Sequence, residues 1–539
     1  MHNRPGKGIP MNQNYRHGIA VAPHAAAAEA AAHILREGGN AIEAMVAAAA
    51  TIAVVYPHMT AIGGDAFWLI HDPGRAPIAI DACGAAAQNA TLDYFKQQGV
   101  STIPIRGPLA ANTVAGTISG WDAALEVSKS WRGKLPLSML LGDAIRRGRE
   151  GIIVTQSQFA STAAKLTELS PQPGFSESFL VDGKSPEAGA RFALPRLANT
   201  LEYLAKAGLA DFYRGDISQS IAKDLIDVGS PVSREDLKRH EALYREPLTI
   251  AHSLGKLYNM TPPTQGVVSL LILAILDRLG LKGLDPVGAD YVHLCVEATK
   301  QAFAIRDKHV TDPAHMNVHA QSLLDDDIVA TLAAKIRRDR AAPWGKNARP
   351  GDTVWMGVID GEGRAVSFIQ SIYHEFGSGI VLKESGVNWQ NRGASFSLDP
   401  KALLVIAPRK KPFHTLNPAL ALFTDGRVMP YGTMGGDGQP QTQCAVFTRI
   451  ANFGMTPQDA IAAPRWLLGR TWGNPSDTLK LESRFDSSVF EGLRARGHEV
   501  EKLGAFDESV GHAGVLIRAR DGNMSGGFDP RSDGGVAGF

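Results

Sequence analysis

Residues 352–371 constrain the fold of this 539-residue chain more than any other segment, because their pattern is that of a β-hairpin. Two apolar runs rich in β-branched residues flank the turn Asp360-Gly361-Glu362-Gly363, which predicts two antiparallel strands. Folding about this turn places Thr353 opposite Ser371, where directly paired residues have Cβ atoms roughly 4.5–5.5 Å apart. If the chain is cut before Thr353, the hydroxyl and a free α-amine share one residue, and the amine can activate the hydroxyl.

Composition excludes several classes of protein. The chain has 44% apolar and 20% charged residues and a formal net charge of +1, which is typical of a globular protein and argues against a nucleic-acid partner. The Ala-rich stretch 25–55 is interrupted by charged and polar residues, and the apolar run 266–276 is too short to cross a bilayer. We therefore expect no membrane partner.

Cysteine usage bears on the compartment. Cys83, Cys295 and Cys444 are widely separated and form neither a disulfide framework nor a metal-binding spacing. The N-terminal residues lack the apolar core of a signal peptide. We expect a cytoplasmic protein that needs no metal and no cofactor. Nothing close to Cys83 in the sequence supplies a matched base or cation, so this thiol is not predicted to be a nucleophile.

The periodicity changes along the chain. Helices are predicted at 23–37, 40–54, 266–276, 289–307, 325–340 and 441–452, and strands at 66–71, 419–423, 428–432 and 514–519. Residues 340–352 show no periodicity and are expected to form an exposed linker. Helices dominate before this linker and strands after it, so we expect a sheet that the second part completes and that helices cover.

Several short motifs accompany the hairpin. They are Pro57-His58-Met59 with Ile62-Gly63-Gly64-Asp65, Pro262-Pro263-Thr264-Gln265-Gly266, Glu297 to Arg306 with Asp312-Pro313, Phe376-Gly377-Ser378-Gly379, and Gly435-Gly436 with Asn452 to Met455 and Ala463-Pro464-Arg465. In this order, and with the hairpin at Thr353, they resemble the γ-glutamyltranspeptidase family from about Gly18 to the C-terminus. The resemblance implies an α/β (α+β) fold, a four-layer αββα sandwich of the N-terminal-nucleophile hydrolase type.

The same resemblance implies a zymogen that cuts itself between Asp352 and Thr353. Residues 1–352 would become a large subunit and residues 353–539 a small subunit, and the two would remain one composite folded unit. Thr353 would attack the preceding carbonyl, and the freed α-amine, with a pKa near ~8, would act as the base in attack on a substrate amide. Ser371 stands where the family usually has a second Thr and would orient the nucleophile.

Gly435 and Gly436 fall between a predicted strand and a predicted helix. Glycines at such a place allow backbone N–H groups to converge at a helix N-terminus, where a developing oxyanion is stabilised. An ordinary strand-to-helix turn is the alternative. A phosphate-binding loop is conceivable there too, but the Lys and Ser/Thr of the Walker pattern are absent.

The positions that would hold the acyl group depart from glutamyl-transferring members of the family. They are occupied here by Cys83, Tyr373, Arg392, Ser395, His414 and Thr415. A guanidinium is unsuited to an ammonium group, so Arg392 predicts an anionic acyl group without an amine, and Arg106 could be a second carboxylate anchor. Structural ion pairing is the alternative for both arginines. Tyr373 and His414 are expected to line the pocket rather than to act as acid or base.

This pattern resembles the subgroup of the family that includes oxamate amidohydrolases. We expect a self-processing amidohydrolase or acyl transferase that acts on a small anionic amide such as oxamate. The alternatives are a true γ-glutamyltransferase or glutathione hydrolase, a glutaryl-type (cephalosporin) acylase, and an unprocessed scaffold protein. The expected partners are the substrate, the two subunits of one precursor, and further copies in a homo-oligomer of processed heterodimers.

Overall fold

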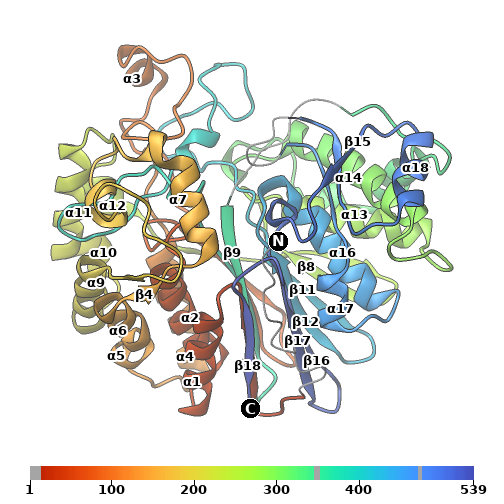
Figure 1. Cartoon of the computed structure of the whole chain (residues 1–539), viewed down its shortest axis with the longest axis horizontal. Helices are drawn as coiled ribbons and strands as arrows, with labels where there is room; N and C mark the ends of the chain where they lie inside the picture. The colour runs from red at the N-terminus through yellow and green to blue at the C-terminus, as the bar shows by residue number, and fades with distance from the viewer. Residues whose placement is uncertain (1–13, 345–351, 471–475) are drawn as a thin grey trace.

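The structure of this protein is a computed structural model that describes residues 14–344, 352–470 and 476–539. Two large antiparallel sheets lie face to face at its centre, and helices cover both outer faces (Figure 1). The predicted four-layer αββα sandwich is confirmed. Most of the predicted linker, residues 345–351, lies outside the described residues.

The first sheet contains the predicted hairpin at its centre. Its strands, in spatial order, are β18 Gly535–Gly538, β1 Gly18–Ala22, β9 Asp352–Asp360, β10 Ala365–Tyr373, β2 Asp65–His71, β3 Ile78–Ala82 and β6 Leu243–Arg245. The predicted register of β9 and β10 holds from the pair Ala365–Ile359 to the pair Gln370–Val354. It then shifts by one residue, so that Tyr373 pairs with Asp352. The predicted direct pairing of Thr353 with Ser371 is therefore wrong in detail, because both residues lie at this irregularity.

The second sheet is built mainly from the later part of the chain. Its strands, in spatial order, are β17 Met524–Phe528, β16 Ala513–Arg518, β12 Val428–Thr433, β11 Ala419–Phe423, β8 Gly255–Asn259 and β7 Leu248–His252. Both sheets thus contain strands from before and after residues 345–351. Neither part of the chain can complete a sheet without the other.

Helices form the two outer layers. The first sheet is covered by α1 Ala25–Arg36, α2 Ala41–Val55 and α4 Thr117–Ser130, and the second by α13 Gly266–Leu279, α16 Gln439–Ala451 and α17 Pro457–Ala462, with α14 Ala289–His309 packed on α13 and α16. The remaining α-helices are α3 Leu92–Gln97, α5 Leu137–Leu140, α6 Gly142–Glu150, α7 Gln156–Leu169, α8 Phe175–Phe179, α9 Pro195–Ala207, α10 Asp211–Arg214, α11 Asp216–Asp227, α12 Arg234–Arg239, α15 Asp326–Ala334 and α18 Ser487–Ala495. Short strands form two further small sheets, β4 Ile152–Ile153 with β5 Arg191–Phe192, and β13 Trp466–Leu468 with β14 Leu479–Glu482 and β15 Val500–Leu503.

Two helix ends show how local chemistry sets the boundaries. Asn40 caps α2 as predicted, because its side chain accepts from the N–H groups of Ile42 and Glu43 while Glu43 accepts from the N–H of Asn40. The helix predicted at 325–340 is shorter, since α15 ends at Ala334. Beyond that end the carbonyl of Arg337 contacts the His293 ring nitrogen, at 2.7 Å, instead of continuing the helix.

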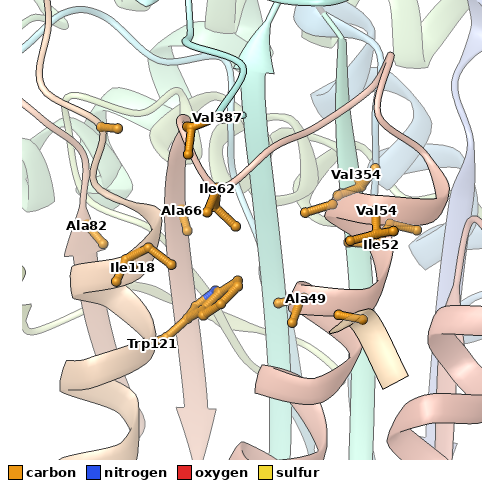
Figure 2. Close-up of a cluster of buried hydrophobic side chains, with 14 of the residues drawn as sticks. Ala49, Ile52, Val54, Ile62, Ala66, Ala82, Ile118, Trp121, Val354 and Val387 are labelled. Atoms are coloured by element: carbon orange, nitrogen blue, oxygen red, sulfur yellow. The ribbon is translucent and has the colours of Figure 1, made fainter. Parts of the chain in front are cut away.

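Three apolar clusters fill the three spaces between the four layers. Along β9, Val354 belongs to the cluster under the first helix layer, where Figure 2 shows it beside Ile52 and Val54 of α2. Trp355, next in the strand, belongs to the cluster between the sheets. Because side chains alternate along a strand, Thr353 faces the space between the sheets, as Trp355 does.

The three cysteines are free and buried. Among the helices of the described residues, none is both long and apolar enough to cross a membrane.

Candidate active site

Thr353 lies at the beginning of β9, fully buried between the two sheets. Gln439, the first residue of α16, points its side-chain amide at the Thr353 hydroxyl, with Nε2 3.5 Å from Oγ1. On the neighbouring strand the Ser371 hydroxyl accepts a hydrogen bond of 2.8 Å from the backbone N–H of Tyr373. The structure therefore brings the two predicted hydroxyl residues to one end of the hairpin, next to the start of α16.

The glycine pair lies in the turn that leads from β12 into α16. Gly435 and Gly436 have φ values of 118° and 54°, a left-handed conformation that favours glycine. A 3₁₀ turn, Gly436–Gly438, connects them to Gln439. Within the described part of the chain, the backbone N–H groups of Gly435 and Gly436 donate no hydrogen bond. The turn that carries these two N–H groups leads directly into Gln439, the residue whose side chain contacts Thr353, and N–H groups of this kind can stabilise an oxyanion.

Buried side chains hold this turn in place. Gln265 donates hydrogen bonds from Nε2 to the carbonyls of Gly436, at 2.9 Å, and Thr415, at 2.8 Å. Arg306 donates to the side chains of Gln265, at 3.1 Å, and Asp437, at 2.8 Å. In the sequence, Gln265 and Arg306 are recognisable only as members of motifs. Their contacts with the glycine turn could not be inferred, because the partners are more than 100 residues apart.

Arg392 is a buried cation that forms no hydrogen bond with any residue the structure describes. It begins the 3₁₀ turn Arg392–Ser395, is 1% exposed, and places its guanidinium carbon 3.9 Å from the centre of the Tyr373 ring. None of its three guanidinium nitrogens has a hydrogen-bond partner among the described residues. Burial lowers its pKa to about 10, so it stays charged at neutral pH. A buried guanidinium whose nitrogens form no hydrogen bond is costly, and an anionic ligand would satisfy these nitrogens.

Other buried polar atoms near Arg392 also lack partners. Among the described residues these atoms include the hydroxyls of Ser395 and Thr415, both ring nitrogens of His414 and one carboxylate oxygen of Asp65. Buried polar groups in native proteins are normally hydrogen-bonded. Their concentration here indicates a site for a small polar ligand.

Asp65, a residue of the Ile62-Gly63-Gly64-Asp65 motif for which the sequence indicates no role, lies in this group. Its Oδ1 accepts hydrogen bonds from the N–H groups of Gly84, at 2.9 Å, and Gly116, at 3.0 Å. Its Oδ2 is 3.2 Å from Nε2 of His414, but the geometry is not that of a hydrogen bond. Burial raises the pKa of Asp65 to about 7, whereas burial and Arg392 lower the pKa of His414 well below its usual value. At neutral pH the imidazole is therefore uncharged and the carboxyl is partly protonated.

A cavity of about 710 Å³ adjoins the site. Its lining includes Tyr373, Ser395, Arg306 and Phe413, each of which belongs to or directly flanks the groups described above. The cavity is much larger than a two-carbon acid needs.

Two other residues considered in the sequence lie in different surroundings. Arg106 donates to the backbone carbonyls of Glu375 and Gly377 and contacts the carboxylate of Glu168 at 3.2 Å. This is the structural ion pairing that was the alternative for this residue. Cys83 is buried, and burial raises the pKa of its thiol well above the usual value, which makes it a poor nucleophile.

Comparisons with known proteins agree over nearly the whole chain. A family model described as Gamma-glutamyltranspeptidase matches residues 27–539. The oxamate amidohydrolase proenzyme of Klebsiella pneumoniae subsp. pneumoniae is 56% identical over 524 residues, which cover 97% of this chain and 98% of that protein. A glutathione hydrolase-like proenzyme of Bacillus subtilis, YwrD, is 39% identical over 97% of this chain and 98% of its own length. The crystal structure of a cephalosporin acylase from Bacillus halodurans has a TM-score of 0.90 at 30% identity and covers 100% of this chain and 99% of that chain.

Proposed function

This chain belongs to the γ-glutamyltranspeptidase family, and we propose that it is a self-processing amidohydrolase of small anionic amides such as oxamate. The relative with 56% identity is a proenzyme with this named activity, and the family supplies the class of reaction. The remaining question is how the residues of this chain would carry it out.

Self-cleavage uses the position of Thr353 at the start of β9. Its Oγ attacks the carbonyl carbon of Asp352, the peptide C–N bond breaks, and water hydrolyses the resulting ester. The products are a large subunit that ends at Asp352 and a small subunit that begins at Thr353. Because both sheets mix strands from the two parts, the subunits stay assembled as one heterodimer after the cut.

The mature enzyme then repeats this chemistry on substrate. The α-amine of Thr353 takes the hydroxyl proton while Oγ attacks the amide carbonyl. The N–H groups of Gly435 and Gly436 stabilise the oxyanion, and the amine returns the proton to the departing nitrogen. With oxamate, ammonia leaves, an oxalyl ester remains on Thr353, and water releases oxalate. Ser371 orients the nucleophile from the adjacent strand.

The choice of an anionic acyl group rests on the guanidinium of Arg392, which has no hydrogen-bond partner in the described ranges of the chain. Arg392 lies over the ring of Tyr373, and Tyr373 is the direct partner of Asp352 across the hairpin. Paired strands are about 4.8 Å apart, so the residue that Arg392 stacks on has its backbone next to the cut, an arrangement that supports a short acyl group between Arg392 and Thr353. A γ-glutamyl group would instead bring its positively charged ammonium toward the positively charged guanidinium of Arg392.

The test compares amide hydrolysis of oxamate, a glutaryl amide and a γ-glutamyl anilide. We expect kcat/KM to be highest for oxamate, and efficient release from the γ-glutamyl compound would overturn the proposal. Arg392→Ala should raise KM for oxamate about 10- to 100-fold with a smaller effect on kcat, since a charge-assisted hydrogen bond contributes roughly 1.5–3 kcal/mol. Arg392→Lys keeps the charge but not the planar guanidinium that can bind a carboxylate through two hydrogen bonds. Its KM for oxamate should therefore lie between those of the native protein and Arg392→Ala.

The size of the adjoining cavity favours a second candidate substrate. An amide with the same short anionic acyl group and a larger amine part would fill much more of the 710 Å³ than oxamate does. N-alkyl and N-aryl oxamates test this directly, because a kcat/KM above that of oxamate would identify the larger amide as the preferred substrate.

The proposed partners are this substrate and the two subunits of one precursor, assembled as a heterodimer that can associate into a homo-oligomer. We place the protein in the cytoplasm, a proposal supported by its three free, buried thiols.

A further inference from the structure

Asp65 occupies a defined place beside the predicted catalytic residues. It pairs directly with Ser371 in the ladder between β2 and β10, and Ser371 lies on the strand next to that of Thr353. Phe67 and Leu69 lie on the same face of β2 as Asp65, because side chains alternate along a strand. Both belong to the cluster between the sheets. The carboxyl of Asp65 therefore faces the same space as Thr353, two strands away.

The two oxygens of Asp65 have different surroundings. Oδ1 is fixed by the N–H groups of Gly84 and Gly116, whereas Oδ2 has no hydrogen-bond partner among the described residues and points toward His414. The titratable and charged groups that face this carboxyl from the surrounding elements are Arg392, His414, Cys83 and Tyr213. Asp65 is therefore not a surface charge, and its Oδ2 lies beside His414, one of the residues with unsatisfied polar atoms near Arg392.

We propose that Asp65 is a proton-linked specificity residue, which must be protonated when the carboxylate of an anionic amide binds to Arg392. This inference rests on the proposed function. Two carboxylates beside one guanidinium in a buried site repel each other, so one of them is favoured in its neutral form. The proton comes from solvent and resides on Oδ2, which faces the uncharged ring of His414 at 3.2 Å from Nε2.

The proposal explains how one pocket could separate two kinds of acyl group. An anionic acyl group requires neutral Asp65, whereas an acyl group with an ammonium would be favoured by ionised Asp65. Since burial already raises the pKa of Asp65 to about 7 in the unliganded protein, the bound anion has only to raise it further. Affinity for the anion should then fall by up to about tenfold for each pH unit above 7.

The experiment counts the protons taken up when pyruvate binds to the processed protein. Pyruvate has the carboxylate and adjacent carbonyl of oxamate but no amide bond to break. Calorimetry at pH 7 and pH 8, in two buffers with different ionisation enthalpies, gives the number of protons. We expect about half a proton at pH 7 and more at pH 8 for the native protein.

Asp65→Asn keeps the oxygen that accepts from Gly84 and Gly116 but cannot titrate, and its uptake at pH 7 should be near zero. The matched control is Asp360→Asn at the turn end of β9, because Asp360 is also buried and burial also raises its pKa. This control should take up protons as the native protein does. The α-amine of Thr353, with a pKa near ~8, is already mostly protonated at pH 7 and is present in all three proteins.

Equal uptake in the native and Asp65→Asn proteins, or no uptake at pH 7 in the native protein, would overturn the inference. If Asp65→Asn fails to fold, the proton uptake of the native protein at pH 7 still tests the inference. Uptake near half a proton requires a group that titrates near pH 7. A protein that does not hydrolyse oxamate at any pH would refute the proposed function instead. The two failures are therefore distinguishable.

Discussion

The guanidinium of Arg306 donates a hydrogen bond to the carboxylate of Asp437, 2.8 Å away, and this buried pair joins α14 to the glycine turn beside Thr353. The same arginine contacts Gln265, which in turn holds the carbonyl of Gly436. Two residues of the future large subunit thus position the proposed oxyanion donors of the small subunit.

Arg306→Met should lower kcat by about 10- to 100-fold with little change in KM. The reason is that the N–H groups of Gly435 and Gly436 would no longer be held in a fixed orientation toward the oxyanion. Each such hydrogen bond stabilises the transition state by roughly 3 kcal/mol. The unpaired Asp437 should also lower the free energy of unfolding by about 3–5 kcal/mol. Steady-state kinetics and thermal unfolding measure the two effects.

The control for this variant is Arg146→Met. Arg146 also forms ion pairs with carboxylates, but it is half exposed, so its loss should change neither kcat nor the melting temperature appreciably. A native kcat in a folded Arg306→Met protein would refute the positioning role.

Gly435→Ala tests the oxyanion donors without creating a steric clash. A Cβ at this position would come no closer than 3.5 Å to Gly511, but the backbone φ of 118° is strained for alanine. We expect a folded protein whose kcat is lower by about 10²- to 10³-fold, because the turn relaxes and its N–H groups move.

Gly454→Ala is the matched comparison, since Gly454 also has positive φ, at 70°, and open space around it, but lies beyond the end of α16. It should cost about 1 kcal/mol of stability and leave kcat unchanged. Similar kinetics of both variants would contradict the assignment of Gly435.

The chain just before the cut is held by a buried pair on α14. Glu297 accepts from the N–H of Ala342, at 3.0 Å, and Lys300 donates to the carbonyl of the same residue, at 2.6 Å. The two side chains also contact each other at 2.7 Å. This pair fixes the chain at Ala342, a short distance in sequence before Thr353, and closure entropy falls by about 0.6 kcal/mol for each halving of the chain length between a fixed point and a reacting bond.

The double variant Glu297→Gln/Lys300→Met removes both charges together and should slow self-cleavage about threefold, with kcat of the processed enzyme unchanged. A time course of precursor loss on denaturing gels measures this rate. Glu126→Gln/Lys129→Met, an exposed pair with the same spacing, should process at the native rate. Equal rates for all three proteins would exclude an anchoring role.

The sequence was sufficient for features that depend on neighbours in the chain. The turn at 360–363 set the register of the hairpin over six pairs, and Asn40 with Glu43 set the start of α2. The register shift before Tyr373 was not predictable, because it arises where β10 also pairs with β2, a strand about 300 residues away. For the same reason, the contacts of Asp65, Gln265 and Arg306 have no local signal in periodicity or spacing.

In the substrate pocket, too, some features could be predicted from the sequence and others depend on contacts between distant residues. Arg392 was singled out because the resemblance to the family aligns it with a position where an ammonium-binding residue is expected, and a guanidinium does not suit that role. The absence of hydrogen-bond partners for its nitrogens among the described residues, and its position over Tyr373, required the folded arrangement.

The mechanism depends on a cut before Thr353, after which the hydroxyl of the new N-terminal threonine is the nucleophile and its α-amine is the base. N-terminal sequencing and intact mass of the purified protein, combined with an assay of ammonia release from oxamate, test it most directly. We predict two fragments, residues 1–352 and 353–539, the second beginning with threonine, and a single inactive chain for Thr353→Ala. An intact full-length chain that hydrolyses the substrate would contradict the account.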